Sequence, residues 1–272
     1  MDAGNPFTTF DDIKTFGWSL ALVLARLLPL FVLLPFAGRN LFPGLLRNGV
    51  AIGVGLVVAP MLMPAVAEAS LGGLALIALI LKEAFIGLML GFLVALPFWA
   101  VEAAGFVIDN QRGASVAATI NPMTGHDTSP LGIMLVQGFI AFFFIIGGFL
   151  VLLGMVYDSY LQWHPLHFWP QLDMAASELF MGQLNRLVVL ALLLAAPVLV
   201  AMFLAELGLA LVSRFTPQLQ VFILAMPIKS GLAMLTLGLY VALMFEYTRP
   251  YIEEIGSWVR LLHLGPIGGE VR

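Results

Sequence analysis

The sequence holds 272 residues, of which 61% are hydrophobic and only 10% are charged. Soluble domains carry charge on roughly a quarter of their residues, so lipid or other apolar helices surround most of this chain. The net charge of −4 argues against nucleic-acid binding, and the absence of cysteine excludes disulfides and thiolate metal sites.

Six apolar stretches approach or exceed the length of a membrane helix, which needs about 20 mostly apolar residues. They cover residues 17–37, 49–67, 71–107, 131–157, 184–213 and 219–246. The stretches do not alternate apolar and polar residues as barrel strands do. The sequence therefore predicts an all-α, polytopic membrane protein, with about six long and partly broken helices in one membrane domain spanning residues 1–272.

Charged residues inside these stretches are costly in lipid, so each either serves a function or is neutralised at a helix contact. Arg26 lies in the middle of the first stretch, and we expect it to meet a carboxylate or carbonyl group of another helix. The third stretch contains Lys82, Glu83, Pro97 and Glu102 and is too long for one straight span, which predicts two helical pieces or a kink. Adjacent helix positions point in different directions, so we expect Lys82 and Glu83 to make separate contacts rather than one mutual bridge.

A polar segment rich in small residues follows, at 107–130. Glu102 and Asp109 are seven residues apart and share the helix face that leads into it. Composition alone favours a surface loop outside the membrane. Within the membrane, such a backbone is tolerated only inside protein or where it lines a water-filled cavity.

The fifth and sixth stretches are joined by "LVSRFTPQLQ", which contains Arg214. This short connection predicts an antiparallel hairpin turned near Thr216–Pro217. Glu206 and Lys229 lie at nearly the same height on its two arms, so they form an ion pair or each faces a partner subunit. After the hairpin, we expect a short interfacial helix over residues 250–263 and a loose Gly-rich end.

Features of a catalytic site are scarce. His164 and His167 occur in "WHPLHFWP" without a nearby carboxylate, which is more typical of an aromatic loop with Trp163 at the depth of the lipid headgroups. The sequence has no phosphate-binding loop and no nucleophile elbow. It therefore predicts a protein that is not an enzyme and holds no cofactor or metal.

Four blocks resemble a known family: "DNQRGA" within 82–115, "NPMTGHDTSPLG" at 121–132, and "SRFTPQLQVF" and "MPIKSG" within 203–231. Together they resemble the FliR/SctT family of type III export apparatus proteins, and the injectisome branch, SctT, more closely than the flagellar branch. The resemblance runs from about residue 20 to about residue 245, and both tails match poorly.

The resemblance implies a single-copy, non-enzymatic, multi-pass subunit of a helical export gate in the bacterial inner membrane. Its partners would be P-type and Q-type sister subunits, other secretion components and the unfolded polypeptides that are exported. The fold would be a P-type-like part at 1–180, a Q-type-like hairpin at 181–247 and a polar tail at 248–272. The segment 107–130 would project into the closed pore as a plug. The plug residues would be Gln111, Arg112, Gly113, Ala114 and Ser115 at the base, and Asn121, Pro122, Met123, Thr124 and Gly125 within or just beyond it.

Two other function classes remain open at this stage. A secondary transporter would explain charged residues in broken helices, although we find no repeated half in the sequence. An intramembrane enzyme lacks a matched nucleophile and base. The charged residues that could serve assembly or gating are Arg26, Lys82, Glu83, Glu102, Asp109, Glu206, Arg214 and Lys229.

Overall fold

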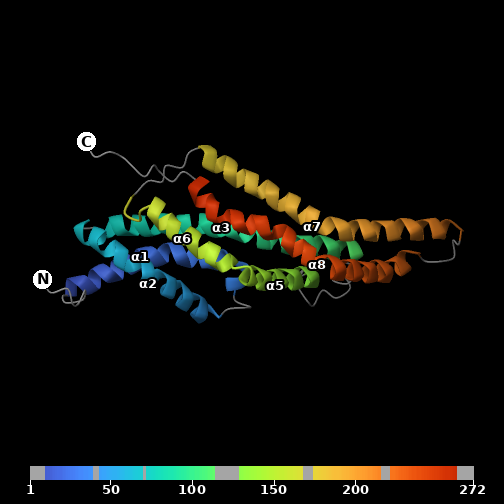
Figure 1. The fold of residues 1–272 in the computed structure, drawn as a ribbon, viewed down its shortest axis with the longest axis horizontal. Helices are drawn as coiled ribbons and strands as arrows, with labels where there is room; N and C mark the ends of the chain where they lie inside the picture. Colours follow the sequence, from blue (N-terminus) through green and yellow to red (C-terminus); the bar gives the residue numbers. More distant parts are fainter. Residues whose placement is uncertain are drawn as a thin grey trace. The chain divides into compact units, whose positions relative to one another are not determined.

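A computed structural model describes residues 10–38, 43–69, 72–113, 129–167, 174–215 and 221–261 (Figure 1). All regular elements in these ranges are helices. They are α1 (Phe10–Leu33), η1 (Pro35–Ala37), α2 (Gly44–Glu68), α3 (Gly73–Arg112), α5 (Pro130–Ile145), α6 (Gly148–Gln162), α7 (Met174–Phe215) and α8 (Val221–Leu261).

The predicted fold class is confirmed. Within the described ranges, 5 helices are long and apolar enough to cross a membrane, and α5 with α6 brings the number to 6 if the bent pair is one span. Each of the six predicted stretches therefore contains a helix or a pair of helices. The chain is a polytopic, all-α membrane protein.

The helix breaks differ from those predicted. The third stretch forms one unbroken helix that continues through Pro97, so of the two predicted alternatives the two helical pieces are wrong, and a kink stays a prediction. The break lies instead in the fourth stretch, where α5 and α6 meet at 73°. Gly147 there has a φ of 78°, which glycine adopts without a steric cost, and Gly148 leaves room for the ring of Phe143.

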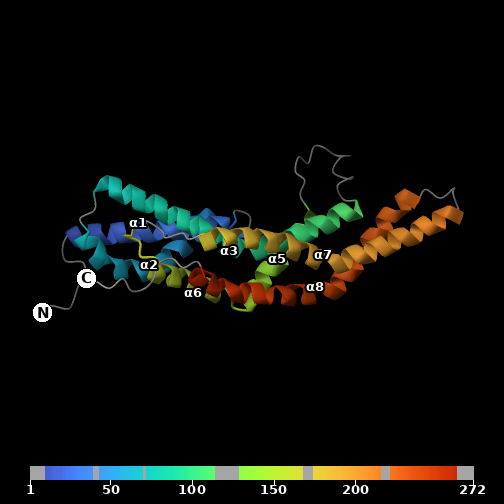
Figure 2. The same cartoon turned by 90° about the horizontal axis from the view of Figure 1, so that it is seen from above.

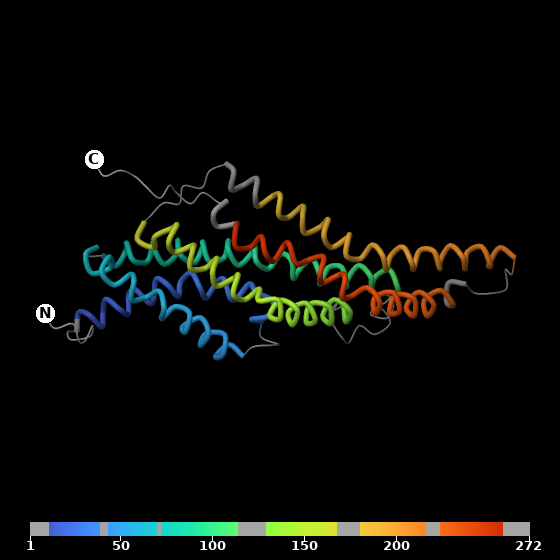
Figure 3. Tube along the Cα trace, in the orientation of Figure 1, coloured from blue at the N-terminus to red at the C-terminus, as the bar shows by residue number. Residues whose placement is uncertain are grey.

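The last helix is also longer than expected. α8 runs through Pro250 to Leu261, so the interfacial helix predicted for 250–263 is the C-terminal part of α8 rather than a separate element. Figure 3 traces this helix as a single coil towards the C-terminal end of the described residues.

The chain forms two compact units. The first contains Met1–Ala95, Phe149–Phe180 and Glu254–Arg272, and the second contains Leu96–Gly148 and Met181–Glu253. The long helices α3, α7 and α8 contribute to both units. The predicted division into a P-type-like part and a Q-type-like hairpin stays a prediction.

In the first unit, α1 packs against α2 and crosses the N-terminal half of α3. The crossing with α3 depends on two glycines four residues apart, a spacing that allows helix backbones to approach closely. A Cβ atom at Gly87 would overlap the carbonyl oxygen of Arg26, and one at Gly91 would lie 2.9 Å from Cα of Leu30. Larger side chains at these glycines would therefore force the helices apart.

In the second unit, aromatic rings join α3, α5 and α8. The fully buried ring of Phe98 has its centroid 5.0 Å from that of Phe139 and 5.1 Å from that of Phe143, both edge to face. The ring of Phe245 on α8 lies 5.8 Å from that of Phe139. Through this cluster α5 packs against both other helices.

The predicted hairpin is present. Figures 1 and 2 show α7 and α8 side by side, with their chain directions opposed. Its turn, predicted near Thr216–Pro217, lies outside the described residues. Large apolar side chains of both arms stay exposed within this chain: Phe203, Leu204, Leu211, Phe215, Leu235, Leu239 and Leu243. Lipid or partner proteins must cover them.

Candidate functional site

A buried charge network joins three helices of the first unit around Arg26, which is fully buried on α1. Its Nε donates to Glu83 Oε2 on α3 at 2.7 Å, and its Nη1 donates to Ser159 Oγ on α6 at 2.9 Å. Its Nη2 donates to the Trp163 carbonyl oxygen at 3.0 Å, and the guanidinium lies 4.1 Å from the centre of the Tyr160 ring. The prediction that Arg26 meets a carboxylate or carbonyl of another helix is confirmed, since it meets both.

Lys82 and Glu83 extend this network. Lys82 Nζ lies 2.6 Å from Glu83 Oε1, so the prediction that the two residues form no mutual bridge is wrong. The long, flexible lysine stem brings the ammonium back towards its neighbour even though the two Cβ atoms diverge. The contact is ionic without hydrogen-bond alignment at Oε1. Separate partners exist as well, because Lys82 donates to the carbonyl oxygens of Pro165 at 2.7 Å and His167 at 2.9 Å.

The network is suited to holding helices together rather than to catalysis. It contains two cations and one carboxylate, and the remaining acceptors are neutral. Ser159 and Tyr160, whose hydroxyl donates to the Val23 carbonyl oxygen at 2.8 Å, were not foreseen as members. The stretch "VYDSYLQW" contains several polar residues, and no spacing singled out Ser159 from Asp158.

A second cluster lies where α3 ends and α5 begins, and we call residues 109–113 and 129–132 the stem. Asp109 is buried, and its Oδ2 accepts hydrogen bonds from Ser129 Oγ at 2.6 Å and from the backbone N–H of Leu131 at 3.0 Å. Ser129 caps α5 by accepting from the N–H of Gly132 at 2.8 Å. Arg112 Nη2 lies 2.6 Å from the other oxygen, Oδ1, in an ionic contact without hydrogen-bond alignment.

Backbone contact makes the stem close-packed. A Cβ atom at Gly105 would lie 2.5 Å from Cα of Gly132, so α3 and α5 touch at their backbones one turn before Asp109. The serine and proline at 129 and 130 are a recognised helix-start signal, from which the beginning of α5 could have been found. The pairing of Asp109 with this start had no signal in the sequence.

The predicted plug residues divide between described and undescribed parts of the chain. Gln111 is exposed, Arg112 contacts Asp109, and Gly113 has a φ of 90° and faces Met226 of α8. The "DNQRGA" and "MPIKSG" blocks therefore meet in space. The other predicted plug residues lie outside the described residues: Ala114, Ser115, Asn121, Pro122, Met123, Thr124 and Gly125.

The remaining candidate charges are distributed along α3 and the hairpin. Lys229 Nζ lies 3.1 Å from Glu206 Oε2, which confirms the predicted ion pair, although the Glu206 side chain is 47% exposed. Arg214 is exposed in the last turn of α7, and Glu102 is exposed on α3. Glu102 and Asp109 share a helix face, but only Asp109 is buried.

The loop after α6 places His164 beside positive charge. Its Nδ1 lies 3.4 Å from the N–H of Leu166, and its ring centroid lies 5.7 Å from that of His167. Burial, and then the nearby His167 and Lys82, lower the pKa of His164 below its usual value. Trp163 is only 4% exposed, so its ring packs within this chain, and its depth at the lipid headgroups stays a prediction.

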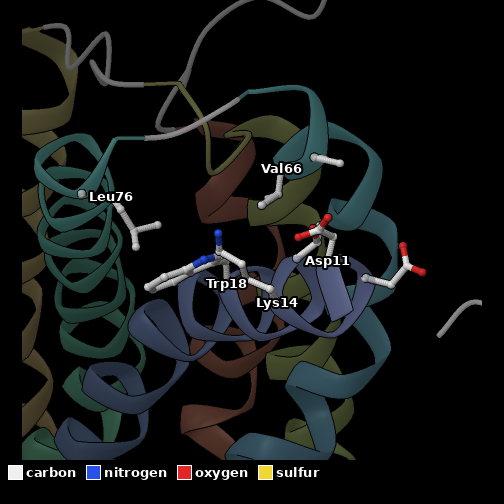
Figure 4. Close-up of a pocket in the computed structure, with 9 residues that line it drawn as sticks. Asp11, Lys14, Trp18, Val66 and Leu76 are labelled. Atoms are coloured by element: carbon white, nitrogen blue, oxygen red, sulfur yellow. The ribbon is translucent and has the colours of Figure 1, made fainter. Parts of the chain in front are cut away.

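Figure 4 shows a hollow where the N-terminal turns of α1, the end of α2 and the start of α3 meet. Asp11, Lys14 and Trp18 contribute from α1, Val66 from α2 and Leu76 from α3. Asp11 and Lys14 are exposed, as is typical of a solvated helix end. Over the described parts of the chain, no three His, Cys, Asp or Glu side chains gather into a possible metal site.

Comparison with known proteins decides the family. Residues 18–255 match the family described as "Bacterial export proteins, family 1". The chain belongs to this family. Over 230 residues it is 44% identical to "Yop proteins translocation protein T" of Yersinia pestis, an alignment that covers 83% of this chain and 87% of that relative.

Two further relatives locate this export protein within its family. It is 37% identical over 224 residues to "Surface presentation of antigens protein SpaR" of Salmonella typhimurium, covering 82% of each chain. It is 28% identical over 230 residues to "Flagellar biosynthetic protein FliR" of Bacillus subtilis, covering 84% of this chain and 88% of the relative. These identities agree with the FliR/SctT resemblance and with its injectisome branch.

Proposed function

We propose that this export protein is a non-enzymatic subunit of the export gate of a type III secretion system in the bacterial inner membrane. In this role it forms and seals the channel through which unfolded proteins are exported. The stem is the observation that carries the proposal. It joins the last turns of α3 to the first turn of α5, the two helices that flank the polar segment 114–128, beside a close-packed crossing.

Hydration of its backbone by channel water would allow a polar segment to remain within an apolar assembly. Unpaired backbone groups are tolerated at membrane depth where they line water, so a segment that fills an aqueous channel keeps its polar groups hydrated. Pro122 and Gly125 disfavour a continuous helix there. An unfolded polypeptide should displace such a segment more easily than it would displace a continuous helix.

The partners in this proposal are P-type and Q-type sister subunits, with this chain in a single copy. The exposed apolar side chains of the hairpin support partners on that face, since this chain leaves them uncovered. The Arg26, Lys82 and Glu83 network supports an internal role, because its charges are paired within one unit. The same pairing weighs against the alternative of a secondary transporter, in which buried charges must be able to bind an ion or solute.

Co-expression tests the proposal. A tagged full-length chain should co-purify with the P-type and Q-type subunits of its own secretion system, and should be recovered in lower yield without them. A chain that is monodisperse and stable alone, ignores both subunits and binds a small solute would instead support the transporter.

A further inference from the structure

We propose that Asp109 is a positioning residue, which fixes the first turn of α5 against the last turns of α3. In doing so it sets how far apart the two ends of the α3–α5 connection lie. Its effect on the channel rests on the proposed function, whereas its effect on the two helices does not.

The hydrogen bonds of Asp109 differ from ordinary helix capping. The start of α5 already has its own cap, because Ser129 Oγ accepts from the N–H of Gly132. Asp109 adds a second acceptor from a different helix, which takes the N–H of Leu131 and the Ser129 hydroxyl on one oxygen. A side chain that lies in the last turn of one helix and caps another fixes their relative position as well as stabilising the capped helix.

Charge and burial strengthen this link. The carboxylate stands at the N-terminus of α5, where the unpaired N–H groups and the helix dipole favour a negative charge. Asp109 is only 3% exposed, so water does not readily replace its partners. Arg112 lies one turn later on α3 and holds the second oxygen. The carboxylate is thereby oriented from its own helix towards the neighbouring one.

The length of the side chain fits this role. The backbones of α3 and α5 touch at Gly105 and Gly132, so the short aspartate reaches Leu131 directly. Gly113, at the end of the α3 side of the stem, has a φ of 90°, a conformation that L side chains rarely adopt. The stem therefore combines a close helix crossing, a cap contributed by a second helix and a glycine with a positive φ just after α3.

Hydrogen exchange of the full-length chain in nanodiscs tests the proposal. Asp109→Leu removes both acceptors, and the amides of residues 131–133 should then exchange about tenfold faster or more, since hydrogen bonds to charged groups are among the strong ones. Asp109→Asn keeps one acceptor oxygen and should restore most of the protection. The control is Glu102→Leu, which removes an exposed carboxylate from the same helix and should leave these amides unchanged.

Two results would overturn the proposal: exchange at 131–133 that is unchanged in Asp109→Leu, or exchange that rises equally in α7 and α8. If the Asp109→Leu chain does not accumulate, Ser129→Ala removes one hydrogen bond to Asp109 and is measured at Leu131, whose N–H is bonded to Asp109 and not to Ser129. Unchanged exchange at Leu131, or an equal rise in α7 and α8, would count against the proposal. Faster local exchange without any ion leak in the assembled complex would support the positioning role and contradict the sealing function. The two proposals therefore fail separately.

Discussion

Replacing Glu83 with glutamine probes the buried network most directly. Among the described residues, Glu83 is the carboxylate that both Arg26 and Lys82 contact, at 2.7 and 2.6 Å, and it is fully buried. The amide keeps nearly the same shape and one acceptor oxygen. It loses the negative charge, however, and its NH₂ group would face one of two cations.

The stability cost of Glu83→Gln depends on the hydrogen bonds that Arg26 keeps. Removing one partner of a buried ion pair costs about 3–5 kcal/mol, because the other charge is left uncompensated. Arg26 retains its bonds to Ser159 and to the Trp163 carbonyl oxygen, which places the cost near the lower end of that range. For a chain of this size, we expect the thermal unfolding midpoint to fall by on the order of 10 °C.

Thermal unfolding in nanodiscs, followed by tryptophan fluorescence, measures this effect. The matched control is Glu206→Gln, which breaks the Glu206–Lys229 pair, where the carboxylate is 47% exposed and charge contributes little. A second variant, Glu83→Ala, should be at least as damaging and should also lower the yield of assembled complex. A midpoint for Glu83→Gln equal to that of Glu206→Gln would refute a stabilising role for the network.

Two further predictions concern helix contact and pH. Gly87→Ala should lower the unfolding midpoint and loosen α1 from α3, because the added Cβ overlaps the Arg26 carbonyl oxygen. The control Gly154→Ala has open space around the added Cβ and should leave the midpoint unchanged. Equal midpoints for the two variants would contradict the close crossing. Since the pKa of His164 is lowered in the folded state, the unfolded state binds more protons, and stability should fall as pH drops through about 6.5. His164→Gln should reduce the loss of midpoint between pH 7.5 and 5.5, and an unchanged pH dependence would count against the half-buried, neutral histidine.

Some features were predictable because apolar surroundings leave few choices. A lone arginine inside an apolar stretch must find a polar partner, so the environment of Arg26 could be stated in advance. A short connection between two long apolar stretches forces a hairpin, and equal heights then brought Glu206 and Lys229 together. Both predictions rest on the high cost of placing polar or charged groups in lipid, which does not depend on how the helices pack.

The errors came from packing details that spacing does not encode. Pro97 was expected to divide its helix in two or to kink it, yet membrane helices tolerate proline where neighbouring groups satisfy the freed backbone, and α3 is not divided. The break at Gly147 depends on a single positive φ. Asp109 was recognised as a candidate charge, but its partners come from the start of another helix, which no pattern in α3 could reveal.

Membrane conductance of the assembled complex tests the central claim most directly. Deleting residues 117–124 removes part of the predicted plug and leaves the stem at 109–113 and 129–132 in place. The account predicts a complex that assembles in nearly normal yield and lets ions or small solutes leak across the membrane, while the wild-type complex stays tight. An assembled deletion complex that remains tight to ions would contradict the claim that this segment seals the export channel.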